Sequence, residues 1–337
     1  MPVTALREGG IAASTGLGVP FGKGRRILNF LFLVIACCLA FAPTHARAGS
    51  PTCTISMTAL NFGNVDVLPG TAVDTTATIT ESCSGGGGNG QRVCISIGSG
   101  TVFTGSQRQL NGPSSAKLNY DLYTNSARTQ LWGSWQTGFD TSGVQLDFAQ
   151  NSTNNITVYA RLFASQQTAT PGSYTTTFTA NPFMQYDDKG TIACPTGNRN
   201  SSTSTSASTT VLSTCNISAT NVAFGSVGLL TANNDATGTV NAQCSNALPY
   251  TVSLNGGLTG ASDPTQRKMA KGAEQITYGL YRDSARSQAW GSTVGTNTVS
   301  GTGSGLSQSL TTYGRVPSQA TGSPGTYSDT IVATVTY

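Results

Sequence analysis

The segment that decides the fold is Leu118-Asn-Tyr-Asp-Leu-Tyr-Thr-Asn-Ser-Ala-Arg128, which returns 158 residues later as Ile276-Thr-Tyr-Gly-Leu-Tyr-Arg-Asp-Ser-Ala-Arg286. Both copies are followed at the same distance by Trp-Gly-Ser, beginning at Trp132 and at Trp290. Two further landmarks recur in the same order: Cys-x-Ile-Ser leading to Phe-Gly (from Cys53 and Cys215), and Pro-Gly-x-Tyr (ending at Tyr174 and Tyr327). Because the landmarks keep their order with small changes of spacing, we predict two copies of one domain.

Each copy is built from short alternating segments separated by turn residues. Residues 237–244, 250–254 and 330–337 alternate with period two, and the last of them puts Ile331, Ala333, Val335 and Tyr337 on one face. Charged residues make up only 9% of the chain, which is poor material for surface helices. We therefore predict an all-β chain with two immunoglobulin-like β-sandwich domains of six or seven strands each.

The predicted boundaries follow from the repeat. The first domain is expected over residues 49–195 and the second over 213–337. Between them, the polar run at 197–210 is rich in Ser and Thr and predicts a flexible linker over residues 196–212.

Residues 1–48 are typical of a secretory signal peptide. Arg25 and Arg26 precede an apolar run at 27–42, and Ala46-Arg47-Ala48 supplies the small residues before a cleavage site. The rival interpretation is lipoprotein processing at Cys37. Cleavage after Ala48 removes the single histidine and leaves 13 basic and 13 acidic residues, so we expect no nucleic-acid partner.

Six cysteines remain after that cleavage, and an even number in an exported chain predicts disulfides. Their spacing repeats, which pairs Cys53 with Cys83 and Cys215 with Cys244, and leaves Cys94 to pair with Cys194. Metal binding is the alternative, but the mature chain has no histidine and no Cys-x-x-Cys pair, so we expect no metal and no cofactor.

The ends of the two copies differ. The first copy continues past its Pro-Gly-x-Tyr strand through 182–186 to Cys194, whereas the second copy stops at Tyr337, inside a strand. We expect the first domain to be complete and the second to lack its closing strand, with Ile331, Ala333, Val335 and Tyr337 beside the open groove. A strand donated by a partner is the physical remedy for such a groove.

The second copy resembles the spore coat protein U domain, which occurs in subunits of Csu-type (archaic) chaperone–usher pili. The matching residues are Cys215, Phe224-Gly225, Cys244, Tyr278 to Tyr281, Trp290-Gly291, Tyr313 to Pro317, Pro324 to Asp329, and Thr334 to Tyr337. The first copy matches less well: it keeps Phe62-Gly63 and Trp132-Gly133, but has Tyr159-Ala-Arg-Leu162 and an added pair of cysteines.

The resemblance implies a partner set. Subunits of this family are incomplete sandwiches, and a periplasmic pilus chaperone, followed by the N-terminal extension of an adjacent pilin subunit, supplies the missing strand while an outer-membrane usher assembles the fibre. Two-domain members are tip adhesins whose first domain binds an abiotic or host surface and promotes biofilm formation. Only residues 49–52 precede Cys53 after the predicted cleavage, too few for a donor strand, which also favours the pilus tip at the cell surface.

Residues that differ between the copies are candidates for surface binding, because shared residues serve the shared fold. The first copy alone has a set of apolar residues in loop-like contexts, which we expect to form an exposed patch: Trp135, Phe139, Val144, Leu146, Leu68 and Phe103. The alternative is that they cover the core locally. By the same argument the recurring Trp132 and Trp290 are expected to be structural.

Three other functions compete with adhesion to apolar surfaces. The Ser/Thr/Asn-rich surface with its aromatics suits sugar binding, and a structural shaft pilin or an envelope coat protein would need no adhesive site. An enzyme is not expected, because histidine-dependent nucleophiles are missing. The paired carboxylates Asp140 with Asp147, and Asp187 with Asp188, lie in loop-like contexts typical of solvated turns.

Overall fold

The computed structural model describes residues 49–135, 139 and 141–337, so the predicted signal peptide lies outside the described residues. Within that part of the chain nearly all regular structure is strand, and the one helical element is a short 3-10 turn, η1 (Pro113–Ser115). No helix there is long and apolar enough to cross a membrane. The predicted all-β fold is confirmed.

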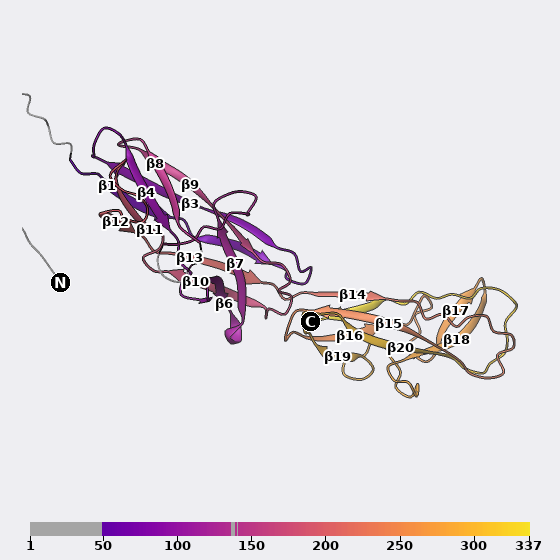
Figure 1. Ribbon diagram of the computed structural model, residues 1–337. Helices are drawn as coiled ribbons and strands as arrows, with labels where there is room; N and C mark the ends of the chain where they lie inside the picture. The colour runs from indigo at the N-terminus through magenta and orange to yellow at the C-terminus, as the bar shows by residue number, and fades with distance from the viewer. Residues whose placement is uncertain (1–48, 136–138, 140) are drawn as a thin grey trace, which may run out of the picture. The chain divides into compact units, whose positions relative to one another are not determined.

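The first sandwich contains two sheets (Figure 1). The larger runs in the order β1-β3-β9-β7-β6-β10-β13-β2, with β5 beside β6. Its strands are β1 (Thr52–Met57), β2 (Leu60–Val65), β3 (Val73–Ser84), β5 (Phe103–Thr104), β6 (Gln107–Asn111), β7 (Lys117–Tyr123), β9 (Thr153–Leu162), β10 (Gly172–Phe178) and β13 (Thr205–Val211). The smaller sheet has the order β12 (Arg199–Ser202), β11 (Phe183–Asp188), β4 (Gln91–Ser96), β8 (Val144–Phe148).

Alternation of buried and exposed side chains places the core of this sandwich. Along β3, Ala77 and Ile79 point inward and the residues between them outward, the pattern of a sheet with one covered face. They pack with Val93 and Ile95 of β4, Val158 of β9 and the fully buried ring of Trp132.

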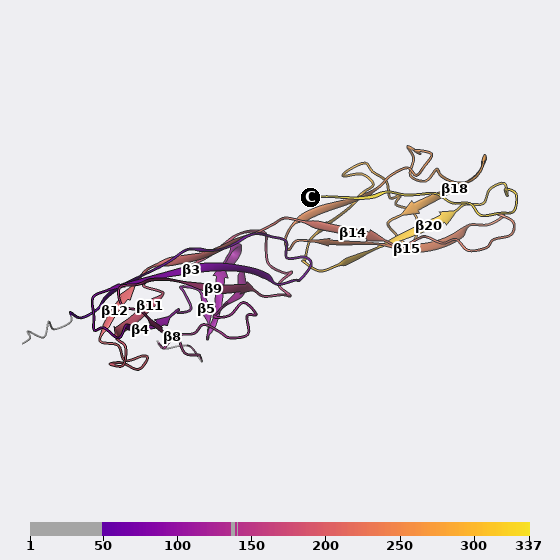
Figure 2. The same cartoon turned by 90° about the horizontal axis from the view of Figure 1, so that it is seen from above.

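The second sandwich repeats the plan with fewer strands (Figure 2). One sheet has the order β14 (Cys215–Ala219), β15 (Asn234–Cys244), β20 (Gln308–Val316), β18 (Glu274–Tyr281), β17 (Arg267–Lys271). The other has the order β19 (Val299–Thr302), β16 (Pro249–Leu254), β21 (Ala333–Thr336). Trp290 lies at the centre of its core, as Trp132 does in the first sandwich.

All three predicted disulfides are confirmed. Cys53–Cys83 joins facing residues of β1 and β3, and Cys215–Cys244 joins facing residues of β14 and β15. Cys94–Cys194 ties β4 to the segment that follows β11.

A buried arginine is bonded to the Trp-Gly segment in both copies. In the first sandwich Arg108 donates from Nη2 to the carbonyl oxygens of Ile97 and Trp132, and in the second Arg267 donates to those of Leu254 and Trp290. Both guanidinium groups are almost fully buried, so these bonds satisfy donors that would otherwise be costly to bury. The predicted structural role of the two tryptophans is confirmed.

The predicted linker over 196–212 is wrong. Its residues form β12 beside β11, and β13, which pairs antiparallel with β10 along seven residues and parallel with β2. Ala207, Thr209 and Val211 point into the core at alternate positions. Composition misled the prediction, because Ser and Thr suit a half-buried strand as well as a linker. The closing strand of the first sandwich therefore comes from this segment.

Glu81 is the exception among the inward side chains of β3. It is fully buried, Asn154 Nδ2 donates to its Oε2 at 2.9 Å, and burial raises the pKa of its carboxyl above the ordinary value of 4.5. Above pH 4.5 the unfolded chain therefore releases a proton that the folded chain keeps, so stability falls as pH rises towards the folded-state pKa.

We predict that Glu81→Gln raises the melting temperature of the first sandwich at pH 7, because it removes a buried charge and keeps an acceptor for Asn154. The gain should shrink as pH falls from the folded-state pKa towards 4.5 and vanish below it, because the carboxyl is then neutral in both the folded and the unfolded chain. Differential scanning calorimetry between pH 4 and 8 measures it. The control is Glu274→Gln: hydrogen bonds from Ser323 and Tyr327 lower the pKa of Glu274 to about 2, so its change should destabilise at pH 7. A gain from Glu81→Gln that does not vary with pH would contradict the argument.

Candidate functional sites

The second sandwich has an open groove beside its core. The cavity measures about 970 Å³ and lies between segments 222–230 and 321–327. Met269, Ile276 and Val316 line it from the sheet, so the side of the groove that the sheet forms is apolar.

The first sandwich shows what is missing there. The segment that corresponds to 222–227 is β2, and β13 fills the space between β2 and β10. Val65 and Val67 are consequently 4% and 5% exposed, whereas their counterparts Val227 and Leu229 are 46% and 73% exposed. The second sandwich thus exposes apolar surface that a closing strand covers in the first.

The backbone shows the same difference. In the first sandwich β11 is flanked by β4 on one side and by β12 on the other. Its counterpart β21 is an edge strand that pairs with β16 alone among the described residues. The free edge carries backbone donors and acceptors that another strand can pair with.

The residues predicted beside the groove do not line the cavity themselves. Ile331, Ala333 and Val335 share one face as predicted, but that face packs on the core, and Tyr337 is 58% exposed. None of the four lines the cavity. The alternation of apolar residues identified which face of the strand points inward. It could not show that the open groove lies along the edge of the strand rather than against this inward face.

A polar cluster holds the rim of the groove. Tyr327 Oη and Ser323 Oγ both donate to Glu274 Oε2, and Lys271 Nζ donates to Ser323 Oγ at 2.6 Å and to Pro324 O at 2.9 Å. These bonds tie segment 321–327 to the β17–β18 turn.

The counterpart of Tyr327 behaves differently in the first sandwich. Tyr174 is fully buried, and its ring packs directly against Gly112. A Cβ at position 112 would lie only 2.2–2.4 Å from the ring atoms, so this contact requires glycine. Four residues after the buried arginine, where the first copy has Gly112, the second has Lys271. A side chain at this position is incompatible with a tyrosine ring placed like that of Tyr174, and Tyr327 instead lines the rim of the cavity.

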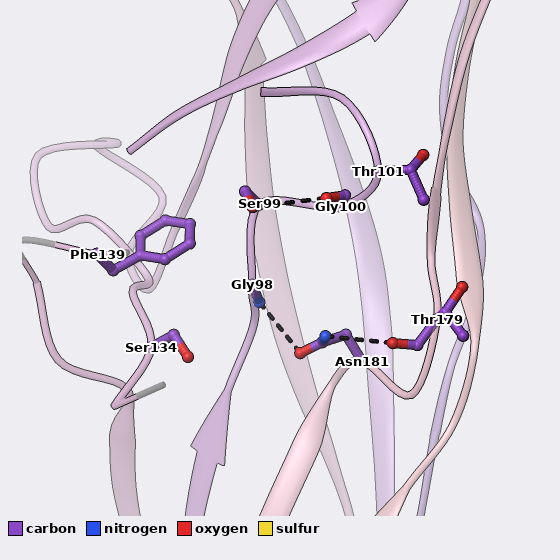
Figure 3. A pocket seen from close by; sticks show the side chains of 8 residues that line it. All are labelled: Gly98, Ser99, Gly100, Thr101, Ser134, Phe139, Thr179 and Asn181. Carbon is purple, nitrogen blue, oxygen red and sulfur yellow. Dashed lines mark hydrogen bonds between the residues drawn. The ribbon is translucent and has the colours of Figure 1, made fainter. Parts of the chain in front are cut away.

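A second site is a smaller, polar pocket of about 210 Å³ in the first sandwich (Figure 3). Its back is the segment 98–101, which follows β4. The ring of Phe139 lies on one side with Ser134 near it, and Thr179 and Asn181 lie on the other.

The predicted surface residues do not form one patch. Phe103 is 54% exposed, whereas Trp135 and Phe139 are half-buried. Val144 and Leu146, in β8, pack against the core, and Leu68 is only 3% exposed, so the prediction is wrong for these three. Val144 and Leu146 are two residues apart, which is the spacing of one face of a strand. No turn residue marks where the loop ends and the strand begins, so the sequence did not distinguish a strand face from an exposed loop.

Two of the carboxylates weighed for catalysis, Asp147 and Asp187, are held in ion pairs, whereas Asp188 Oδ1 accepts the Gly87 amide. Asp147 accepts from Arg92 at 2.8 Å and from Lys189, and the Arg92 hydrogen bond lowers the pKa of Asp147. Asp187 pairs with Arg199 at 2.7 Å. Asp140 lies outside the described residues. The side chains of Cys53, Glu81 and Cys83 lie close together, but both sulfurs are used in a disulfide and are not available to a metal ion.

Comparison with known proteins agrees with the internal repeat. The Spore Coat Protein U domain matches residues 41–181 and again 201–334. Protein U of Myxococcus xanthus is 36% identical over 107 residues, which are 30% of this chain and 59% of that protein. The chain thus spans less than two thirds of this relative's length.

Two solved structures are similar to this chain at low sequence identity, and the first of them shows the same fold. A chain of the CsuC–CsuE chaperone–tip adhesion subunit pre-assembly complex, from the archaic chaperone–usher Csu pili of Acinetobacter baumannii, is 17% identical with a TM-score of 0.52. The match covers 85% of this chain and 100% of that one. The CupB6 tip adhesin of Pseudomonas aeruginosa is 10% identical over 85% of this chain and 94% of its own, with a TM-score of 0.36.

Two successive matches of one domain, each carrying a disulfide from its first strand to the facing strand and a buried Trp-Gly, leave one conclusion: the chain belongs to the spore coat protein U domain family.

Proposed function

We propose that this chain is the tip subunit of a chaperone–usher pilus. Its first sandwich attaches the cell to an abiotic or host surface and promotes biofilm formation, and its second sandwich joins the fibre by accepting a strand from an adjacent subunit. The observation that carries the proposal is the groove of the second sandwich, which the first sandwich fills with β13.

The first sandwich indicates how the strand would be seated. There β13 runs antiparallel to β10 and parallel to β2, with Ala207, Thr209 and Val211 pointing inward. By the repeat, a donated strand would lie between residues 325–331 and 222–227 of the second sandwich. It would cover Val227 and Leu229 and pair with the free edge of β21. Strand addition of this kind draws affinity from main-chain hydrogen bonds and specificity from alternate side chains.

The partners follow from the same need. An exposed apolar groove beside a free strand edge promotes aggregation, so the subunit needs cover from the moment it folds. A periplasmic chaperone would supply it until an outer-membrane usher exchanges the chaperone for the donor strand. Because the first sandwich is closed by its own strand, it needs no partner strand and is free to bind a surface at the fibre tip.

The alternative is a shaft pilin or an envelope coat protein without an adhesive site. This alternative also accounts for the groove of the second sandwich, but it assigns no role to the residues that only the first sandwich has. Phe103, exposed on the two-residue strand β5, and the half-buried Trp135 and Phe139 are the residues that the adhesive proposal uses.

We predict that hydrogen exchange separates the two sandwiches. In the isolated chain, amides of segments 222–230 and 325–331 should exchange at least about tenfold faster than those of 60–68 and 172–178, because they lack the closing strand. Mass spectrometry of peptic fragments measures both in one sample, so the first sandwich is the internal control. In assembled fibres the difference should vanish. Equal protection in the isolated chain would contradict an empty groove.

We predict that antibody against the first sandwich, with immunogold microscopy of producing cells, labels single fibre ends. Gold along the whole shaft would overturn the tip assignment, and gold on the envelope without fibres would overturn the pilus itself.

We predict that Phe103→Ser reduces attachment of cells to polystyrene several-fold while fibres still assemble, because it removes an exposed apolar ring. The matched control is Leu258→Ser, which removes a side chain 75% exposed on the second sandwich and should leave attachment unchanged. Equal loss in both variants, or in neither, would favour the structural alternative.

A further inference from the structure

We infer that the polar pocket of the first sandwich is a binding site for one ring of a neutral saccharide. The pocket lies between segment 98–101, Phe139 and residues 179–181. It combines a single aromatic ring with hydroxyl, amide and bare backbone groups (Figure 3).

The floor of the pocket is fixed before any ligand arrives. Arg108 is 1% exposed, and it donates from Nε to Gly98 O at 2.9 Å and pairs with Asp121 at 2.6 Å. Its guanidinium carbon lies 4.5 Å from the centre of the Phe139 ring, so the same side chain holds both the backbone at the back of the pocket and the aromatic ring at its side. A site that needs no ordering loses less affinity on binding.

The opposite wall is tied to the same backbone. Asn181 Oδ1 accepts the Gly98 amide at 3.2 Å, and Thr101 N donates to Thr177 O at 2.9 Å. Among the described residues, this leaves Asn181 Nδ2 with a long contact of 3.4 Å to Thr179 O, and Ser99 Oγ with one of 3.5 Å to Gly100 O. These donors, and the exposed Thr179, can bond to a ligand without breaking a strong bond.

Glycine keeps the back wall open. A Cβ on Gly98 would come within 3.3 Å of the Asn181 amide, and Gly100 has a φ of +78°, which favours glycine. The backbone of this segment is therefore accessible at a point where other residues would fill the space.

Charge and size select the ligand. Among the described residues, the side chains that line the pocket carry no formal charge, and the charge of Arg108 beneath them is already paired with Asp121. An anionic ligand would find no free cation there. About 210 Å³ is also below the roughly 300–1,000 Å³ of pockets that take drug-sized ligands. A neutral sugar ring has a suitable size and charge for this pocket. Its hydroxyls can hydrogen-bond to the polar groups that line the pocket, and its C–H face can stack on the ring of Phe139.

The second sandwich has lost the same space. The turn that corresponds to 98–101 folds back on itself there: Ala261 N donates to Gly256 O at 2.9 Å, and Asp329 Oδ1 accepts the Leu258 amide at 2.8 Å. Residues 293–297, which correspond to the loop that carries Phe139, include no aromatic residue. The pocket thus belongs to the sandwich that needs no partner strand.

The inference rests on the proposed adhesive role only for its biological use, because binding is tested on the purified full chain without fibres. Saturation-transfer NMR would use the methyl glycosides of glucose, galactose, mannose and N-acetylglucosamine, with N-acetylneuraminic acid as the charged comparison. We expect at least one neutral glycoside to receive transfer through its ring C–H protons, and the charged sugar to receive none.

Two conservative variants locate the site. Phe139→Leu removes the aromatic ring and keeps its bulk, and Thr179→Val removes a hydroxyl at constant shape; each should weaken the titrated affinity about tenfold, with circular dichroism unchanged. Thr259→Ala, in the corresponding turn of the second sandwich, should have no effect. Transfer to no glycoside at tens of millimolar, or affinity unchanged in both Phe139→Leu and Thr179→Val, would overturn the site. Either result would leave the fibre-end labelling, and hence the proposed function, untouched.

Discussion

A β-sandwich of this type depends on the strand along its last edge. That strand pairs with backbone groups which would otherwise be exposed, and its inward side chains cover the interior of the fold. The two copies within this chain differ at this point: the first has β13 between β2 and β10, and the second has a cavity of about 970 Å³. The contrast is informative because disulfide, buried arginine and tryptophan are otherwise the same in both.

The shared parts explain how the second sandwich stays folded with its groove open. A disulfide joins its first two strands, and Arg267 binds carbonyl oxygens from three segments, including those of Leu254 and Trp290. Neither element touches the cavity. The core is thus stabilised by contacts that do not involve the residues lining the groove. Lys271 and Glu274 fix its rim at the same time, because they keep Tyr327 outside the cavity.

The buried arginine of the first sandwich makes contacts that its counterpart in the second sandwich does not make. This arginine keeps the structural bonds seen in the second copy and gains two neighbours, Asp121 and Phe139. The counterpart of Asp121 is Gly279, and the second copy has no aromatic residue in the loop that matches Phe139. The same arginine side chain thus contacts both the backbone and the aromatic ring that line the polar pocket.

The sequence alone determined the duplicated all-β plan, the three disulfides and the inward face of residues 331–335, because spacing and period two report directly on strand pairing and on sheet faces. It also indicated that the two copies end differently. Only the tertiary structure decided where the closing strand of the first sandwich comes from, since Ser- and Thr-rich residues 199–211 have the composition of a linker and become strands only beside β10 and β11. It likewise separated Phe103, which is exposed, from Val144 and Leu146, which are packed on the core, and placed the cavity beside segments 222–230 and 321–327. The physical reason is that burial and cavities depend on what the rest of the chain brings alongside a segment, which local sequence does not encode.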